Sequence, residues 1–239
     1  MRDAVIVSTA RTPIGKAYRG AFNATPGQQL AGHAVKHAVK RAGIEGLEVD
    51  DIIMGAAIQQ GSTGTNIARQ AAIRAGLGVT VPGMSLDRQC ASGMMAIATA
   101  AKQVITDNMD IVVGGGVESV STVQGPKMFV DADPWMKENQ PDMYMSMLET
   151  AETVAARYGV TREDQDAYAA QSQERTHQAQ LAGRFDDEIV PMTSIMKVMN
   201  KETKEIKDAD ADADADEWVE CTLPQLAAVD ADTPKPAAP

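Results

Sequence analysis

Cysteine, aromatic residues and long hydrophobic runs are all scarce in this chain, and each scarcity excludes a class of protein. The 239 residues include only two cysteines, Cys90 and Cys221, too few for a disulfide framework and without the spacing of a zinc site. No apolar run is long enough to cross a bilayer, so we expect no membrane span. Aromatic residues make up 4% of the chain and hydrophobic residues 44%, so the core must be built largely from aliphatic side chains.

Positive charge is also in deficit, which argues against a nucleic acid as partner. The formal net charge is −11. Residues 208–239 contribute −8 of it, from nine acids and one lysine, and residues 1–207 contribute only −3. The start of the chain lacks the pattern of a secretory or transit peptide, so we expect a cytoplasmic protein.

The acidic excess lies in a segment with little globular character. Aspartate alternates with alanine over residues 208–216, and three prolines follow near the end. A calcium-binding loop would need glycine at its sixth position and glutamate at its twelfth, and this segment has neither. Because like charges repel, we predict that residues 207–239 form a disordered acidic tail.

Residues 1–119 alternate between strand-like and helix-like patterns. We predict strands at residues 4–9, 51–58, 83–86 and 110–119 from their β-branched and apolar runs, and helices at 28–42, 67–75 and about 87–108. Asn66 is a candidate N-cap for the second helix, and Gly76 ends it. Strands separated by helices of this length predict an α/β domain with a parallel sheet buried on both faces.

Ligands of such sheets collect at the carboxyl ends of the strands. Cys90, the glycines at 114–116 and the polar loop 59–66 all follow predicted strand ends, so we expect them to meet. The glycine run does not have the spacing of a dinucleotide-binding loop. His33 and His37 are four residues apart on one helix, but no third ligand accompanies them, so we predict a solvated helix face and no metal site.

Cys90 is the candidate catalytic residue. Its predicted position is the first turn of a helix that directly follows a strand, where unsatisfied N–H groups and the helix dipole favour a thiolate. Ala91, Ser92 and Gly93 leave the approach to the sulfur open. The residue is therefore either a nucleophile or a small buried apolar side chain, and the local pattern alone supports both interpretations.

The pattern changes at residue 120. Residues 120–145 are irregular and contain three prolines, and helices are predicted at 149–158 and 162–181, the second capped by Thr161 with Asp164. Short strands are predicted at 188–192 and 195–199. We interpret residues 120–206 as an inserted helical domain. Met143, Met145 and Met147 alternate before its first long helix and could fill gaps in the core or line an acyl-binding surface.

Several segments together resemble the thiolase family, which transfers acyl groups to and from coenzyme A. The resemblance runs in family order over about residues 1–206. It is carried by Val-Ile-Val-Ser-Thr-Ala-Arg-Thr-Pro-Ile-Gly at 5–15, Asn-Ile-Ala-Arg-Gln-Ala-Ala at 66–72, Arg-Gln-Cys-Ala-Ser-Gly at 88–93, Gly-Gly-Val-Glu-Ser at 115–119, Thr-Ala-Glu-Thr-Val-Ala at 150–155, Arg-Glu-Asp-Gln-Asp at 162–166, and Gly-Arg-Phe-Asp-Asp-Glu-Ile-Val-Pro at 183–191.

The resemblance implies a fold and a chemistry. It implies a thiolase-like N-terminal α/β domain at residues 1–119, a coenzyme-A-binding loop domain at 120–206 and the tail at 207–239. It implies that Cys90 accepts the acyl group of an acyl-CoA substrate and that Met147 lies against that group, with no covalently bound cofactor. Ser146 stands where the biosynthetic members often have histidine, which hints at a different acyl chain.

The chain departs from the family in one large respect. The family's second half supplies a histidine in a Gly-His-Pro turn and a second cysteine in a Cys-x-Gly turn, and neither motif occurs here. We therefore expect either an acyltransferase that forms a homo-oligomer or is completed by a separate chain with the second half, or an inactive fragment that only binds and assembles. The related ketosynthases also place a cysteine at a helix start, but the segment at 120–200 fits thiolases better.

Overall fold

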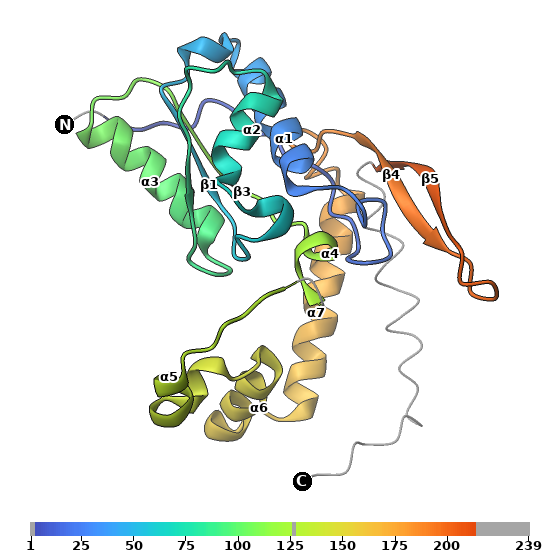
Figure 1. Cartoon of the computed structure of the whole chain (residues 1–239). Helices are drawn as coiled ribbons and strands as arrows, with labels where there is room; N and C mark the ends of the chain where they lie inside the picture. Colours follow the sequence, from blue (N-terminus) through green and yellow to red (C-terminus); the bar gives the residue numbers. More distant parts are fainter. Residues whose placement is uncertain (1–2, 126–127, 214–239) are drawn as a thin grey trace. The chain divides into compact units, whose positions relative to one another are not determined.

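The computed structural model describes residues 3–125 and 128–213, which form two compact units (Figure 1). The first unit contains the described residues up to 128 together with residues 186–213, and the second contains residues 129–185. Among the described residues, no helix is both long and apolar enough to span a membrane.

A three-stranded parallel sheet organises the first unit. Its strands are β1 (Asp51–Gly55), β2 (Met84–Leu86) and β3 (Val112–Gly116), in the order β2-β1-β3. Ile53 of β1 pairs with Met84 on one side and with Gly114 on the other. The parallel sheet predicted from the alternation of strands and helices is confirmed.

Helices cover both faces of the central strand (Figure 1). On one face, Ile52 and Met54 pack in a cluster with α1 (Gly27–Ala42) and α2 (Ile67–Ala75). On the other face, Ile53 packs with Ala96 and Ala100 of α3 (Ser92–Thr106). All five residues of β1 are buried, because a parallel strand between two helix layers has no solvated face.

The predicted helices at 28–42 and 67–75 are confirmed, and so are the caps of the second. The Asn66 side chain accepts a hydrogen bond from the Arg69 backbone N–H at 3.1 Å. Gly76 ends the helix with a φ of 83°, which favours glycine. Short helical turns complete the unit: η1 (Gly46–Glu48), η2 (Gly61–Thr63) and α4 (Val120–Val123).

The strand predicted at residues 4–9 is wrong for this structure. The segment joins no sheet, and the side chains of Val5, Ile6 and Val7 are 76%, 77% and 75% exposed. Among the described residues, side-chain contacts hold it, such as the Ser8 hydroxyl donating to the Ala38 carbonyl at 2.7 Å. A β-branched run becomes a strand only where a neighbouring strand offers hydrogen bonds.

The disorder predicted from residue 207 onward is also wrong where the structure describes that segment. Strand β5 (Ile206–Ala213) pairs antiparallel with β4 (Met192–Met199), so that the first Asp-Ala repeats form a ladder. Met192 of β4 is buried against Ala21 and Phe22. One continuous strand replaces the short one predicted at 195–199, and residues 214–239, including Cys221, lie outside the described residues.

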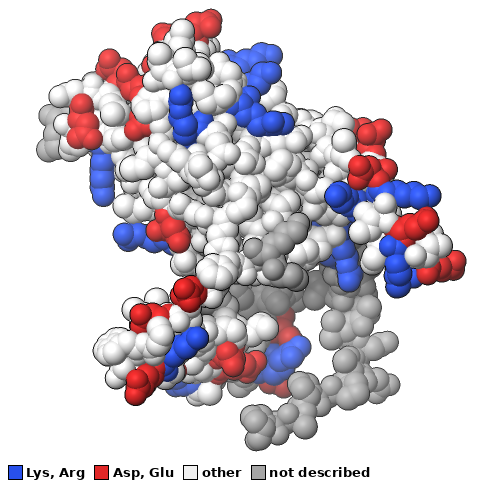
Figure 2. Space-filling view, in the orientation of Figure 1, with Lys and Arg blue, Asp and Glu red and all other residues white. Residues whose placement is uncertain are grey.

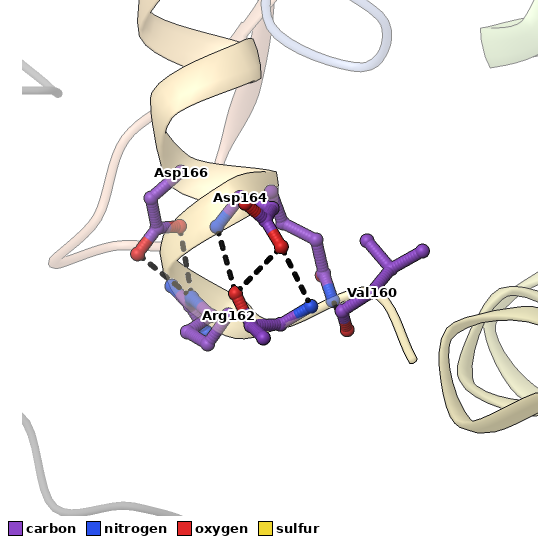
Figure 3. Close-up of polar contacts among 6 residues, drawn as sticks. Val160, Arg162, Asp164 and Asp166 are labelled. Atoms are coloured by element: carbon purple, nitrogen blue, oxygen red, sulfur yellow. Dashed lines mark hydrogen bonds and ion pairs between the residues drawn. The ribbon is translucent and has the colours of Figure 1, made fainter. Parts of the chain in front are cut away.

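The second unit is helical. It contains α5 (Pro134–Asn139), η4 (Pro141–Tyr144), α6 (Met147–Tyr158) and α7 (Arg162–Leu181). Figure 3 shows the start of α7, where the Thr161 hydroxyl and the Asp164 carboxylate form the predicted capping box. Arg162 forms an ion pair with Asp166 at 2.8 Å. The helices predicted at 149–158 and 162–181 are confirmed, the first beginning two residues early, and the division at 119 and 206 stays a prediction.

Candidate functional site

The candidate nucleophile lies in a tight turn between β2 and α3. The helix begins at Ser92 with Ala91 as its N-cap, so Cys90 precedes the helix rather than occupying its first turn as predicted. Gln89 has a φ of 48°, which turns the chain sharply before the cysteine. The cysteine is a free and exposed thiol, so the interpretation of Cys90 as a buried apolar residue is wrong.

A buried hydroxyl fixes this turn. Ser92 Oγ accepts from the Arg88 backbone N–H at 2.8 Å and donates to the Gln89 carbonyl at 2.6 Å. The Asp87 carboxylate accepts from the Gln89 N–H at 2.6 Å. The side chains of Asp87 and Ser92 therefore fix the backbone of the turn on both sides of Cys90.

Glycines allow the helix start to approach the strand ends. A Cβ on Gly116 would lie 2.9 Å from the Gly93 Cα, and one on Gly55 would collide with the Ser92 backbone. Cβ atoms are not found at such distances from backbone, so only glycine fits at the ends of β1 and β3. The predicted meeting of Cys90 with the glycines at 114–116 is confirmed, because they line one cavity of about 1060 Å³.

The loop at 59–66 does not join this cavity, so that part of the predicted meeting is wrong. Its Ser62 hydroxyl lies 2.8 Å from the Thr122 hydroxyl and accepts from the Gly27 N–H. Asn66, at its end, donates to the Gly83 carbonyl at 2.8 Å and accepts from the Ser85 hydroxyl at 3.0 Å. The loop thus acts on the site indirectly, by anchoring the strand that leads to Cys90.

Glu118 is a site residue that the sequence did not single out. One carboxylate oxygen accepts from the N–H groups of Ala57 and Ile58, at 2.8 and 3.2 Å, and the other is buried with no hydrogen-bond partner among the described residues. Burial raises the pKa of this carboxyl above its ordinary value of 4.5, Asp87 adds to the effect, and the two backbone bonds oppose it. Its position directly after a predicted parallel strand, at the edge of the sheet where ligands collect, could have revealed it.

Met147 lies in the second unit, as the first residue of α6. Its side chain is 76% exposed and that of Met143 is 69% exposed, so the core interpretation is wrong for both. Ser146 caps the helix: its hydroxyl accepts from the Glu149 N–H at 3.2 Å. The predicted contact of Met147 with an acyl group stays a prediction.

The two α1 histidines lie against each other, with ring centroids 4.6 Å apart. Partial burial lowers the pKa of His37, and the charges of His33 and Lys40 add to the effect. In the part of the chain that the structure describes, no three metal-ligating side chains cluster.

Comparison with known proteins identifies the family. Residues 4–220 match the family profile described as the thiolase N-terminal domain. The chain is 42% identical over 192 residues to the 3-ketoacyl-CoA thiolase of Bacillus subtilis, covering 80% of this chain and 49% of that protein. It is 40% identical over 208 residues to the acetyl-CoA acetyltransferase of Cupriavidus necator, covering 80% of this chain and 51% of that protein.

A solved structure agrees with these relatives. The crystal structure of the Bacillus anthracis acetyl-CoA acetyltransferase superimposes with a TM-score of 0.73 at 34% identity, covering 95% of this chain and 58% of that one. The chain spans about half the length of the curated relatives it matches. Sequence profile, relatives and fold agree, and the chain belongs to the thiolase family.

Proposed function

We propose that this chain contributes the acyl-accepting part of a thiolase, transferring an acyl group from a coenzyme A thioester to Cys90. The observation that carries the proposal is an exposed free thiol in a pinned turn, immediately before a 15-residue helix and on the wall of a large cavity. The names of two similar proteins, a 3-ketoacyl-CoA thiolase and an acetyl-CoA acetyltransferase, support coenzyme A thioesters as substrates.

The proposed step is a thioester exchange. The Cys90 sulfur attacks the thioester carbonyl, a new carbon–sulfur bond forms to Cys90, and the bond to the coenzyme A sulfur breaks. The proton of the Cys90 thiol leaves with the coenzyme A thiolate. The oxygen of the carbonyl becomes negative during the attack, and the backbone N–H of Cys90 is the local donor we propose for it.

Acyl transfer is the part of this chemistry that we propose for the described residues of this chain. No histidine lines the cavity, since His33 and His37 lie on α1 outside its lining and His177 lies on α7. The Gly-His-Pro and Cys-x-Gly motifs are absent from the sequence. Without a base to move the α-proton, we expect carbon–carbon bond formation to be slower by at least about 10²-fold than in a complete thiolase.

A second candidate is an inactive fragment that binds and assembles without turnover. The observation that favours it is that the chain spans about half the length of its relatives. In both cases we propose a cytoplasmic location, an acyl-CoA ligand and assembly with a further chain, either a second copy or a complementing one.

Intact mass spectrometry after mixing with acetyl-CoA tests the proposal. We expect the full chain to gain one acetyl group, and the Cys90→Ser variant to gain none. Cys221→Ser is the matched control, because it removes the other cysteine and should leave the adduct intact. An adduct that persists in Cys90→Ser, or none in the unaltered chain, would eliminate the acyl-accepting role and leave the second candidate.

A further inference from the structure

The peptide unit between Gln89 and Cys90 is held at its carbonyl end. The Gln89 carbonyl accepts one hydrogen bond from the Ser92 hydroxyl at 2.6 Å and another from the Ser92 backbone N–H at 3.0 Å. This peptide bond is trans, and the C=O and N–H of a planar trans peptide point in opposite directions. Fixing the Gln89 carbonyl therefore fixes the direction of the Cys90 N–H, which points away from Ser92.

That N–H is available as a donor. Two neighbouring N–H groups of the turn are bonded: that of Arg88 donates to the Ser92 hydroxyl at 2.8 Å, and that of Ala91 donates to the Arg88 carbonyl at 3.0 Å. The N–H of Cys90 donates to no group among the described residues. The Ser92 hydroxyl thus closes the turn without using the amide that belongs to the cysteine.

Ser92 is itself firmly seated, and the turn that it closes is strained. Ser92 is 4% exposed, and a Cβ on Gly55 would lie 2.2 Å from its carbonyl carbon, so it packs directly on the end of β1. Gln89 has a φ of 48°, a left-handed conformation that persists only where the surrounding structure holds it. Loss of the Ser92 hydroxyl would therefore leave the Cys90 N–H free to change direction.

The side chains that line the cavity supply no unpaired positive charge. Of the described residues in the lining, only Arg11 and Glu118 are charged, and Arg11 is paired with Glu188 at 3.0 Å. Figure 2 shows a broad uncharged area over the middle of the first unit, with the charged side chains gathered toward its margins. Where charges are few, a fixed N–H stabilises a developing negative charge strongly, so the direction of the Cys90 N–H matters.

We propose that Ser92 is a positioning residue for acyl transfer to Cys90. Its hydroxyl and N–H hold the Gln89 carbonyl so that the Cys90 N–H donates to the thioester oxygen, which becomes negative as the sulfur attacks. Ser92 acts through the peptide unit rather than by touching the acyl group. The inference rests on the proposed acyl-accepting role of Cys90, and it makes Ser92 necessary only for reactions that form an oxyanion.

Two reagents distinguish the amide from the sulfur. With para-nitrophenyl thioacetate, a bond forms between the carbonyl carbon and the Cys90 sulfur, the nitrothiophenolate leaves, and the thiol proton passes to water. Iodoacetamide alkylates the same sulfur by displacement of iodide, and no oxyanion forms. Both rates are measured on the full chain carrying Cys221→Ser, so that Cys90 is the only thiol.

We expect Ser92→Ala to lower the acetylation rate at least about tenfold and to change the alkylation rate less than about twofold, because a misdirected N–H affects only the step with an oxyanion. Ser194→Ala is the matched control and should leave both rates unchanged. Ser194 is 3% exposed, its hydroxyl donates to the Ala21 carbonyl at 2.7 Å, and it lies outside the cavity lining. Ser92→Thr keeps a hydroxyl and should keep the ratio of the two rates, which carries the test if the alanine variant does not fold.

Unchanged acetylation in Ser92→Ala, or equal slowing of both reactions, would overturn the proposal. So would a folded Ser92→Thr that loses the ratio of the two rates. A ratio in the unaltered chain no larger than that of N-acetylcysteine would also overturn it, since there would be no stabilising amide to position. The thioacetate needs no coenzyme A site, so a failure of acetyl-CoA to acetylate Cys90 is a separate result that counts against the proposed function.

Discussion

At the scale of single residues, the geometry around Cys90 depends on polar side chains that neighbour it rather than on the cysteine itself. Ser92 is 4% exposed and satisfies two backbone groups of the turn. Glu118 joins the end of β3 to the residues that follow β1. The hydrogen bonds of both side chains hold loops at the carboxyl edge of the sheet.

The half-buried carboxyl of Glu118 makes stability depend on pH. Because its pKa is raised in the folded chain, its contribution to stability is full below about pH 4.5 and is lost as the pH rises through the folded value. We expect Glu118→Gln to remove this loss, so that the variant gains stability relative to the unaltered chain as the pH rises above 4.5. Urea unfolding midpoints measured across this range check the trend.

Glu149 is the control, because its pKa is shifted in the direction opposite to that of Glu118. The Ser146 hydroxyl and N–H lower the pKa of Glu149, so its contribution is present above pH 4.5 and is lost as the pH falls through the folded value. Glu149→Gln should therefore lose stability relative to the unaltered chain at neutral pH, and the difference should close in acid. Equal trends for the two variants would contradict both assignments.

Met147 tests the predicted acyl contact without disturbing the fold. Since its side chain is 76% exposed, we expect Met147→Ala to change the free energy of unfolding by less than about 0.5 kcal/mol. If Met147 lies against the acyl group, the variant should acetylate Cys90 more slowly than the unaltered chain. Met143→Ala, on a side chain that is 69% exposed, is the control, and an equal rate in all three chains would count against the contact.

At the scale of elements, one side chain couples a helix to the strand that precedes the turn of the candidate nucleophile. Asn66 has a φ of 59°, caps α2, and contacts Gly83 and Ser85 at the start and within β2. Asn66 therefore helps to position the segment that leads to Cys90, although Asn66 itself does not line the cavity.

Two substitutions at Asn66 separate its backbone and side-chain roles. Asn66→Ala loses the hydrogen bonds and also strains a left-handed position, and should cost about 1–2 kcal/mol of unfolding free energy. Asn66→Gly keeps the backbone conformation and should cost less. Chemical unfolding compares the two, and a glycine variant as unstable as the alanine variant would show that the backbone angle contributes little.

At the scale of the whole molecule, the two units differ in how they are stabilised. The first has a buried cluster in which Ile52, Ile67 and Ala71 are fully enclosed. The helices α5, α6 and α7 of the second contain no buried residue and rely on caps and local ion pairs. Local stability follows the number of buried apolar contacts, so the units should open with different free energies.

We predict that amides of α6 and α7 exchange with solvent much faster than those of α2 and β1. Exposed capping boxes and the Arg162–Asp166 pair add little to a helix that buries nothing. Hydrogen exchange followed by mass spectrometry checks this on the full chain. Similar protection in both units would mean that α6 and α7 pack against a surface formed in solution.

Much of the first unit could be predicted because its signals are local. The helical pattern at 28–42 predicted α1, and the glycine at 76 marked the end of α2. The helix α7 was predictable for the same reason, since the capping box of Thr161 and Asp164 marks its start, whereas α6 begins two residues before its predicted start. The start of α3 was predicted about five residues too early, so Cys90 lies two residues before the helix; the Ser92 hydroxyl closes the turn before the helix begins.

The sequence by itself determined the family and the alternation of strands and helices, and it singled out Cys90 as the candidate nucleophile, because helix periodicity, glycine positions and motif order depend on neighbours along the chain. Only the tertiary structure decided which runs become strands. Residues 4–9 stay unpaired despite their β-branched composition, while Ile206–Ala213 forms a strand despite its charges. The reason is physical: a strand is completed by hydrogen bonds from another segment, and no local pattern specifies whether that segment is present.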